Sequence, residues 1–100
     1  MRLPVRFARA ALHDLDGIFD FIAEDNPRRA RSYVADIRAA CQRLGTTPFM
    51  GVDRADIRTG LRVMPLWRRL VVAYQVEPDR VRVLRVFAAG QDYEAIMRDG

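Results

Sequence analysis

Lysine is absent from this chain, and cysteine and histidine each occur once, which restricts the chemistry available to it. Without lysine, no side-chain amine can form a Schiff base. The lone Cys41 cannot close an internal disulfide, and neither it nor His13 has partners at metal-ligand spacing. A single histidine on the polar side of a helix is usually only solvated. We therefore expect no metal site and no cofactor.

Long apolar runs are also missing. The longest spans only a few residues, far short of the ~20 that a membrane-spanning helix needs. The opening MRLPVRF lacks the charged start and apolar core of a secretory signal. These absences predict a cytoplasmic protein with no membrane contact. A length of 100 residues fits a single domain, residues 1–100, that buries roughly 60–70% of its unfolded surface.

Arginine is what the chain has in excess. All 17 basic residues are arginines, against 13 acidic residues, and the net charge is +4. The guanidinium group is a planar, permanently charged fork that suits carboxylates and phosphates. A GC-rich coding sequence would produce the same bias, so the positions of the arginines say more than their number.

The first half of the chain predicts one strand and two helices. Alternation over residues 3–7 indicates a short strand, and a helical period begins near Arg9. A second helix begins at Pro27, because Asn26 is a good N-cap and proline is tolerated at the first helical position. Gly45 ends it. The apolar stripes of the two helices are Leu12, Leu15, Ile18, Phe19 and Ile22, then Ala30, Tyr33, Val34, Ile37, Cys41 and Leu44.

The second half predicts three strands after a loop from Thr46 to Gly60, at Leu61–Leu66, Leu70–Val76 and Val81–Phe87. Short turns make them antiparallel neighbours. The central strand is apolar at nearly every position, as expected of a strand covered on both faces. The helical hairpin covers one face, and with no spare element we expect a partner on the other. The fold class is α+β: an N-terminal strand, an antiparallel helical hairpin, a three-stranded antiparallel meander and a short C-terminal tail.

Charges on the two helices differ in sign. Asp16, Asp20 and Glu24 follow the polar face of the first helix, one turn apart. Such a row could supply a general acid and base, but on an exposed helix face it is far more often solvating. The second helix begins with cations, among them Arg28 and Arg31. Cations in a first turn oppose the helix dipole, which favours a contact with a partner.

The densest basic segment is residues 57–76, which contains four arginines and no acid, with Trp67 at the turn of the first hairpin. Arginine beside an aromatic residue serves nucleic-acid stacking and serves equally as a protein-interface hot spot. A simply solvated surface is the third alternative. Because the charges form no long stripe, an acidic protein segment is favoured over nucleic acid. The four arginines are Arg58, Arg62, Arg68 and Arg69.

The most specific segments are Asp14–Asn26 followed by Pro27, the Pro48–Gly51 loop, Leu70–Val76 with its tyrosine, and Val83–Phe87. Together they resemble the ParE branch of the ParE/RelE toxin superfamily of bacterial toxin–antitoxin systems. The resemblance extends over nearly the whole chain. It implies a small toxin, encoded beside an antitoxin that wraps it and keeps it inactive.

The resembled superfamily includes two activities. RelE-like members cleave messenger RNA on the ribosome, whereas ParE-like members inhibit DNA gyrase. Many relatives of both kinds carry His-x-x-Arg-Asp after the last strand, but residues 88–92 here read AAGQD, and Val71 stands about where RelE-like nucleases have an active-site arginine. RNA cleavage needs a proton acceptor, a proton donor and a cation. Only Tyr93, Arg85 and Glu94 remain of such a set.

We therefore predict that no residue is catalytic and that the chain inhibits DNA gyrase by binding. A ParD-like antitoxin is expected along the helical hairpin and the apolar sheet face, and operator DNA is contacted only through that antitoxin. Two alternatives stay open: a RelE-like, ribosome-dependent mRNA endoribonuclease, and a non-toxic protein that binds the antitoxin. The residues expected to bind the antitoxin are Arg28, Arg31, Arg58, Arg62, Trp67, Arg68 and Arg69.

Overall fold

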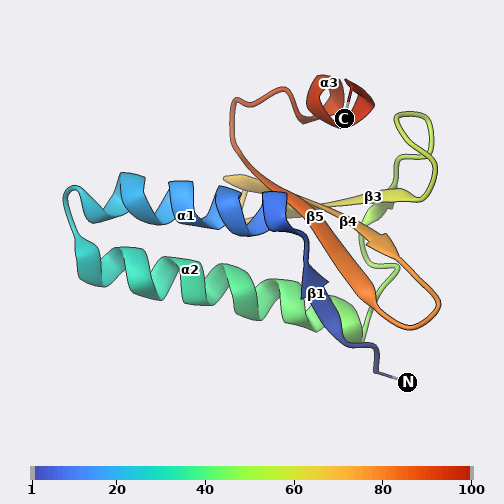
Figure 1. The fold of residues 1–100 in the computed structure, drawn as a ribbon, viewed down its shortest axis with the longest axis horizontal. Coiled ribbons are helices and arrows are strands. Elements are labelled where there is room, and N and C mark those ends of the chain that lie inside the picture. The colour runs from blue at the N-terminus through green and yellow to red at the C-terminus, as the bar shows by residue number, and fades with distance from the viewer. Residues whose placement is uncertain (1, 100) are drawn as a thin grey trace.

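Five strands form one sheet, with two long helices on one face and a short helix on the other (Figure 1). The computed structural model describes residues 2–99. The strand order is β1-β5-β4-β3-β2, parallel between β1 and β5 and antiparallel elsewhere, which confirms the α+β class. In chain order the elements are β1 Val5–Phe7, α1 Arg9–Ala23, α2 Pro27–Gln42, a 3-10 turn η1 Arg43–Gly45, β2 Val52–Asp53, β3 Leu61–Leu66, β4 Leu70–Val76, β5 Val81–Ala88 and α3 Tyr93–Asp99.

The start of α2 is confirmed. The Asn26 side-chain oxygen accepts a hydrogen bond from the Arg29 amide at 3.0 Å, and Pro27 occupies the first helical position. Asparagine satisfies one of the amides that the first turn leaves unpaired, and proline has no amide to satisfy. Local sequence alone therefore determines where the second helix of the hairpin begins.

The apolar stripe predicted for α1 is wrong at one position. Ala11 and Leu15 are buried, whereas Leu12 is 38% exposed. The Ala8 amide donates to the Val83 carbonyl at 2.8 Å, so the first turn of α1 lies directly on β5. The small Ala11 faces that close contact, and Leu12 is turned outward. The packing of helix on strand, rather than the helical period, decides which side is buried.

The meander is confirmed, with β5 one residue longer than predicted, and β4 lies between two neighbours as its continuous apolar pattern indicated. The prediction that residues 46–60 form only a loop is wrong in one respect, because this segment contains β2. Both residues of β2 are exposed and are too few to show an alternation pattern. The short tail is also more regular than expected, since it forms α3.

The second face of the sheet was expected to need a partner, and under α3 that expectation is wrong. Met97 of α3 is buried and packs in a cluster with Phe87 and Leu61, and Ile57 from the loop before β3 joins them. A helix of seven residues is too short to show a clear periodic pattern of apolar residues in the sequence. The chain therefore covers much of this face itself.

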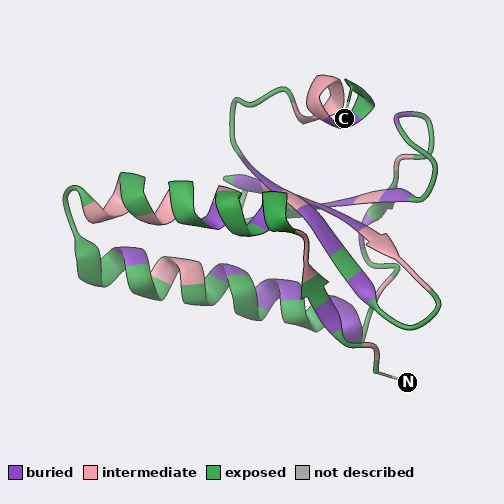
Figure 2. Ribbon diagram, in the orientation of Figure 1, coloured by how far each residue is buried: buried purple, intermediate pink, exposed green. Residues whose placement is uncertain are grey.

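The turn between α1 and α2 is the part of the molecule farthest from the sheet (Figure 1). Burial is concentrated where the helices meet the sheet, and none of residues 16–29 is buried (Figure 2). The outer half of the hairpin therefore carries apolar side chains that the sheet does not cover. No helix within residues 2–99 has the length and apolar content to cross a membrane.

Candidate functional site

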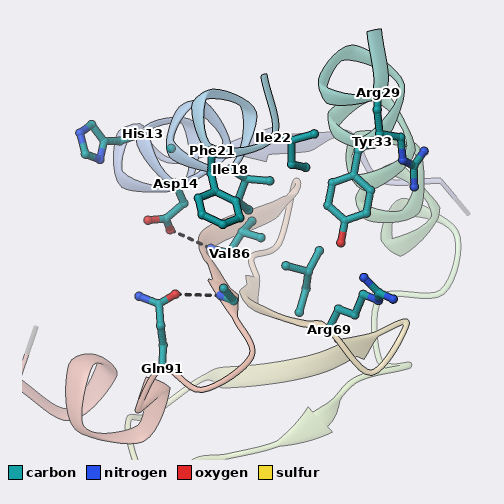
Figure 3. Close-up of a pocket in the computed structure, with 13 residues that line it drawn as sticks. His13, Asp14, Ile18, Phe21, Ile22, Arg29, Tyr33, Arg69, Val86 and Gln91 are labelled. Atoms are coloured by element: carbon teal, nitrogen blue, oxygen red, sulfur yellow. Dashed lines mark hydrogen bonds between the residues drawn. The ribbon is translucent and has the colours of Figure 1, made fainter. Parts of the chain in front are cut away.

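A groove of about 790 Å³ lies between the outer half of the helical hairpin and one end of the sheet (Figure 3). The two helices form one wall. The other wall is formed by the start of β4 at Leu70, the end of β5 from Val86 to Ala88, and Gln91 in the loop that follows. The groove exists because the two helices extend past the ends of the strands. The outer part of each helix face that points toward the sheet is therefore left uncovered.

The helical wall is mostly apolar. Ile18, Phe21 and Ile22 lie three and four residues apart, which places them on one side of α1, and they line the groove together with Tyr33 of α2 (Figure 3). Phe21 is 77% exposed. An exposed aromatic residue beside two half-buried isoleucines is typical of a surface that binds another protein.

The turn between β3 and β4 closes the groove beside α2. The Arg69 amide donates to the Leu66 carbonyl at 3.0 Å, and the two residues between them have positive φ, 54° for Trp67 and 58° for Arg68. Two central residues with positive φ define a type I′ turn, whose twist matches that of the flanking strands. Glycine or asparagine normally occupies these two positions. The Trp67 ring lies 5.6 Å from that of Tyr33, which holds the turn against α2.

The charge left free in the groove is positive. Arg29 lies 5.0 Å from the centre of the Tyr33 ring, and its nearest carboxylate, Asp36, is 4.0 Å away. Arg69 is exposed and takes part in no ion pair within residues 2–99. An arginine without an internal acid is available to a carboxylate from outside.

Asp14, an acidic residue that lines the groove, is already hydrogen-bonded within the chain. Asp14 accepts hydrogen bonds from Arg85 Nε at 2.7 Å, from Arg85 Nη2 at 2.9 Å and from the Val86 amide at 2.8 Å. Asp14 raises the pKa of Arg85 above its ordinary value, chiefly through these hydrogen bonds. Gln91 likewise accepts from the Ala88 amide at 2.8 Å (Figure 3). Both side chains satisfy amides on the edge of β5 that no strand pairs.

A second arginine-centred cluster lies under α3. Arg54 Nη1 donates to the Tyr93 hydroxyl at 2.8 Å, and Nη2 donates to Glu94 at 3.0 Å. The same guanidinium group donates twice to Asp56, at 3.0 Å each. These hydrogen bonds, first to Asp56 and then to Glu94, raise the pKa of Arg54, and Arg54 in turn lowers the pKa of Asp56. The cluster fastens α3 to the loop before β3.

The three residues that a ribonuclease would need do not form one open site. Arg85 is bound to Asp14, whereas Tyr93 and Glu94 are both bound to Arg54. Phe87 lies between them: the Arg85 guanidinium group is 4.9 Å from the centre of its ring, and the Tyr93 ring is 6.1 Å away. Each polar group is thus engaged inside the chain.

Of the seven residues expected to bind an antitoxin, the structure brings Trp67, Arg68 and Arg69 together at the β3–β4 turn. Of the seven, only Arg69 lines the groove, and the role of all seven stays a prediction. Arg62 has a structural task, because its Nη2 donates to two carbonyls of the loop before β2. The remaining three, all exposed, are Arg28, Arg31 and Arg58.

Sequence reasoning did not single out Phe21, and it expected Ile18, Ile22 and Tyr33 to pack against the sheet. Ile18 and Tyr33 do pack against the core, and all three also line the groove. One signal was present in the sequence. Phe21 is a large aromatic residue off the apolar stripe of an amphipathic helix, which marks a candidate contact with another protein.

Within residues 2–99, no group of three or more histidine, cysteine, aspartate or glutamate side chains has an arrangement that could hold a metal ion. Cys41 is buried, and burial raises the pKa of its thiol to about 11. A thiol with such a pKa is an apolar packing group at neutral pH rather than a nucleophile.

Three comparisons with known proteins agree. The family model for the ParE toxin of the type II toxin–antitoxin system parDE matches residues 5–93. Toxin ParE3 of Caulobacter vibrioides is 33% identical over an alignment of 76 residues, and the match covers 73% of this chain and 73% of that one. The solved structure of a chromosomal ParDE toxin–antitoxin system from P. aeruginosa has a TM-score of 0.74 and 25% identity, and the match covers 87% of this chain and 96% of that one.

Proposed function

Because the chain belongs to the ParE toxin family of type II toxin–antitoxin systems, we propose that it inhibits DNA gyrase by binding and that a ParD-like antitoxin neutralises it. The family match over residues 5–93 is the observation that carries this proposal. Gyrase and the antitoxin are cytoplasmic proteins, so the chain acts in the cytoplasm. Operator DNA is reached only through the antitoxin.

Inhibition by binding suits the side chains of the chain. A gyrase inhibitor needs a surface and no bond-making group. The acid, the phenol and the arginine that RNA cleavage would require are bound to Asp14 or Arg54. Freeing them costs charge-assisted hydrogen bonds, which are about twice as strong as neutral ones.

The groove is the proposed docking site of the antitoxin. An amphipathic helix can place apolar side chains against Ile18, Phe21 and Ile22, in the way that helices bind other hydrophobic grooves. Arg29 and Arg69 then meet acidic residues on the polar side of that helix. A standard interface buries ~800 Å² per partner, so the antitoxin is expected to continue past the groove toward Arg28 and Arg31.

A gyrase supercoiling and cleavage assay with the purified chain tests the proposal. We expect loss of supercoiling or accumulation of cleaved DNA, and we expect an equimolar amount of the ParD-like protein encoded beside the chain to restore activity. The preformed toxin–antitoxin complex is the matched control and should be inert. No effect of the free chain on gyrase at high excess contradicts the proposal.

The two alternatives predict other results. A RelE-like endoribonuclease would produce messenger RNA ends at the ribosomal A site when the chain is added to translating ribosomes. A non-toxic antitoxin-binding protein would leave growth unaltered when the folded chain is induced without its antitoxin. Either result, with gyrase unaffected, replaces the proposed function.

A further inference from the structure

A second exposed apolar cluster lies in the loop before β2 and in β2 itself. The side chains of Phe49, Met50 and Val52 are 66%, 55% and 59% exposed, and we call these three residues the loop cluster. None of them lines the groove. Val52 belongs to β2, the last strand of the sheet, so the cluster lies at the sheet edge opposite to β1. The outer edge of β2 has no paired strand within the described chain.

Buried groups hold this loop in one conformation. The hydroxyl of Tyr74, a fully buried residue, donates to the Pro48 carbonyl and accepts from the Gly51 amide, both at 2.8 Å. A Cβ atom on Gly51 would lie 2.7 Å from that hydroxyl and from the Val63 carbonyl, so a glycine is required. The loop is thereby fixed to the sheet from beneath.

Arg62 supports the loop from the side. Its Nη2 donates to the carbonyls of Phe49 and Gly51, at 3.2 and 2.9 Å, and its guanidinium group lies 5.2 Å from the centre of the Phe49 ring. The Phe49 ring is therefore presented on a rigid base while most of its surface faces solvent. A contact that is ordered before binding loses little conformational entropy on binding.

The size of the cluster indicates what kind of interface it serves. Three side chains of this type offer on the order of 300 Å² of apolar surface, against the ~800 Å² per partner of a stable interface. That is too little for pairing of two copies of this chain, but it suits the central anchor of a larger surface on a different protein. Arg43 is exposed and has no ion pair in the described residues, and its carbonyl accepts a hydrogen bond from the Thr47 hydroxyl, which lies 4.0 Å from the Met50 sulfur. A free cation beside the cluster fits a partner with acidic groups around an apolar pocket.

The other large apolar side chains that are exposed in the described part of the chain belong elsewhere. Phe21 lines the groove, Trp67 packs on Tyr33 beside it, and Leu12 stands alone on α1. The loop cluster is thus the apolar group that an antitoxin in the groove leaves unused. We propose that the loop cluster is the anchor by which the chain binds its target, which under the proposed function is gyrase, through an acid-rimmed apolar pocket.

The test compares two surfaces in two assays. The Phe49→Ser, Met50→Ser double variant is expected to need at least about tenfold more protein than wild type to inhibit gyrase, while its affinity for the antitoxin stays within about threefold. Phe21→Ser is the matched control in the groove and is expected to show the reverse. Met50→Ser alone leaves the Phe49–Arg62 contact in place, so it guards against a result caused by a disordered loop. Thermal unfolding confirms that each variant is folded.

Each outcome has one meaning. If wild type leaves gyrase unaffected, the proposed function fails, and this assignment of the loop fails with it. If wild type inhibits gyrase and both loop variants inhibit it equally well, only the assignment is overturned. Loss of antitoxin affinity in a folded loop variant, or a change in its oligomeric state, also overturns the assignment, because the loop would then bind the antitoxin or a second copy.

Discussion

The groove and the Arg54 cluster both contain arginine and tyrosine, and they differ in whether the arginine finds acidic partners within the chain. Under α3, Arg54 is fully engaged by Tyr93, Glu94 and Asp56 within the chain. In the groove, Arg69 has no ion pair within residues 2–99. The first arrangement stabilises the fold, and the second leaves charge and apolar surface for another molecule.

Backbone strain follows the same division. Among residues 2–99, the two non-glycine residues with positive φ are Trp67 and Arg68, and both lie at the turn beside the groove. A left-handed backbone costs such residues ~1 kcal/mol or more each, and such strain persists where other interactions require it. The turn beside the groove therefore lowers the stability of the fold, whereas the hydrogen bonds under α3 raise it. A sequence selected for folding alone would place glycine at this turn.

Reversing the charge at the turn should have the largest effect on antitoxin binding. We expect Arg68→Glu with Arg69→Glu to weaken the complex roughly 30- to 100-fold, because acidic groups of the antitoxin would then be repelled. Isothermal titration measures the change. Arg6→Glu with Arg82→Glu is the control, since it changes the net charge equally at two exposed residues outside the groove. An equal loss in both variants would show that overall charge, rather than the turn, sets the affinity.

Removing Arg54 should affect folding and leave binding intact. Arg54→Met deletes the hydrogen bonds to Tyr93 and Glu94, so we expect the thermal midpoint to fall by several degrees and the α3 amides to exchange faster. Affinity for the antitoxin should stay the same. Arg58→Met, also in the loop before β3, should leave the midpoint nearly unchanged. If the two variants behave alike, the cluster does not hold α3.

Relieving the strained turn should raise stability slightly. Arg68 has a φ of 58°, so Arg68→Gly is expected to increase the free energy of unfolding by about 0.5–1 kcal/mol, measured in urea. The same variant should bind the antitoxin less tightly, because it loses a cation. Gly60 has a φ of 82°, and Gly60→Ala is the opposite control, expected to destabilise. A destabilised Arg68→Gly would mean that the arginine side chain stabilises the turn.

The smallest expected effect is the one that acid has on the stability of the Arg54 cluster. Arg54 holds the pKa of Asp56 below its ordinary value of 3.8. The stabilising contribution of Asp56 is therefore complete above that value, and it is lost as the pH falls from there through the lowered pKa of Asp56 in the folded protein. We expect the thermal midpoint of Asp56→Asn to vary less than that of wild type from about pH 5 to about pH 2. Identical pH profiles would remove Asp56 from the cluster.

Much of the fold could be predicted from local pattern. Asn26 and Pro27 mark the start of α2, and the apolar run Leu70–Val76 marks the central strand, because capping and burial on both faces act within a few residues. The parallel pairing of β1 with β5, the two-residue strand β2 and the helix α3 could not be predicted in this way. They depend on contacts between distant segments and are too short to show a period.

The groove was only partly predictable. Arg69 lines it, and this residue with the adjacent Trp67 and Arg68 was predicted to contact a partner from composition and from its place in a turn, a role that stays a prediction. Ile18 and Tyr33 were expected in the core, because the helical period shows which side of a helix is apolar but not whether a sheet extends far enough to cover it. In this protein the helices extend past the sheet, and the outer part of their apolar side is left open.

Local patterns were enough to predict the α+β class, the starts of the two long helices, the three main strands to within one residue, and an excess of positive charge carried by arginine alone. The end of α2 was not predicted, because the helix ends at Gln42 and a 3-10 turn continues to Gly45. Which arginines serve the fold and which stay available depends on tertiary packing. Two of the three partners of Arg54, Tyr93 and Glu94, lie 39 and 40 residues away in the chain, and Asp14 lies 71 residues from Arg85. Ion pairs over such separations are formed by the packing of the sheet and helices, so no local pattern records them.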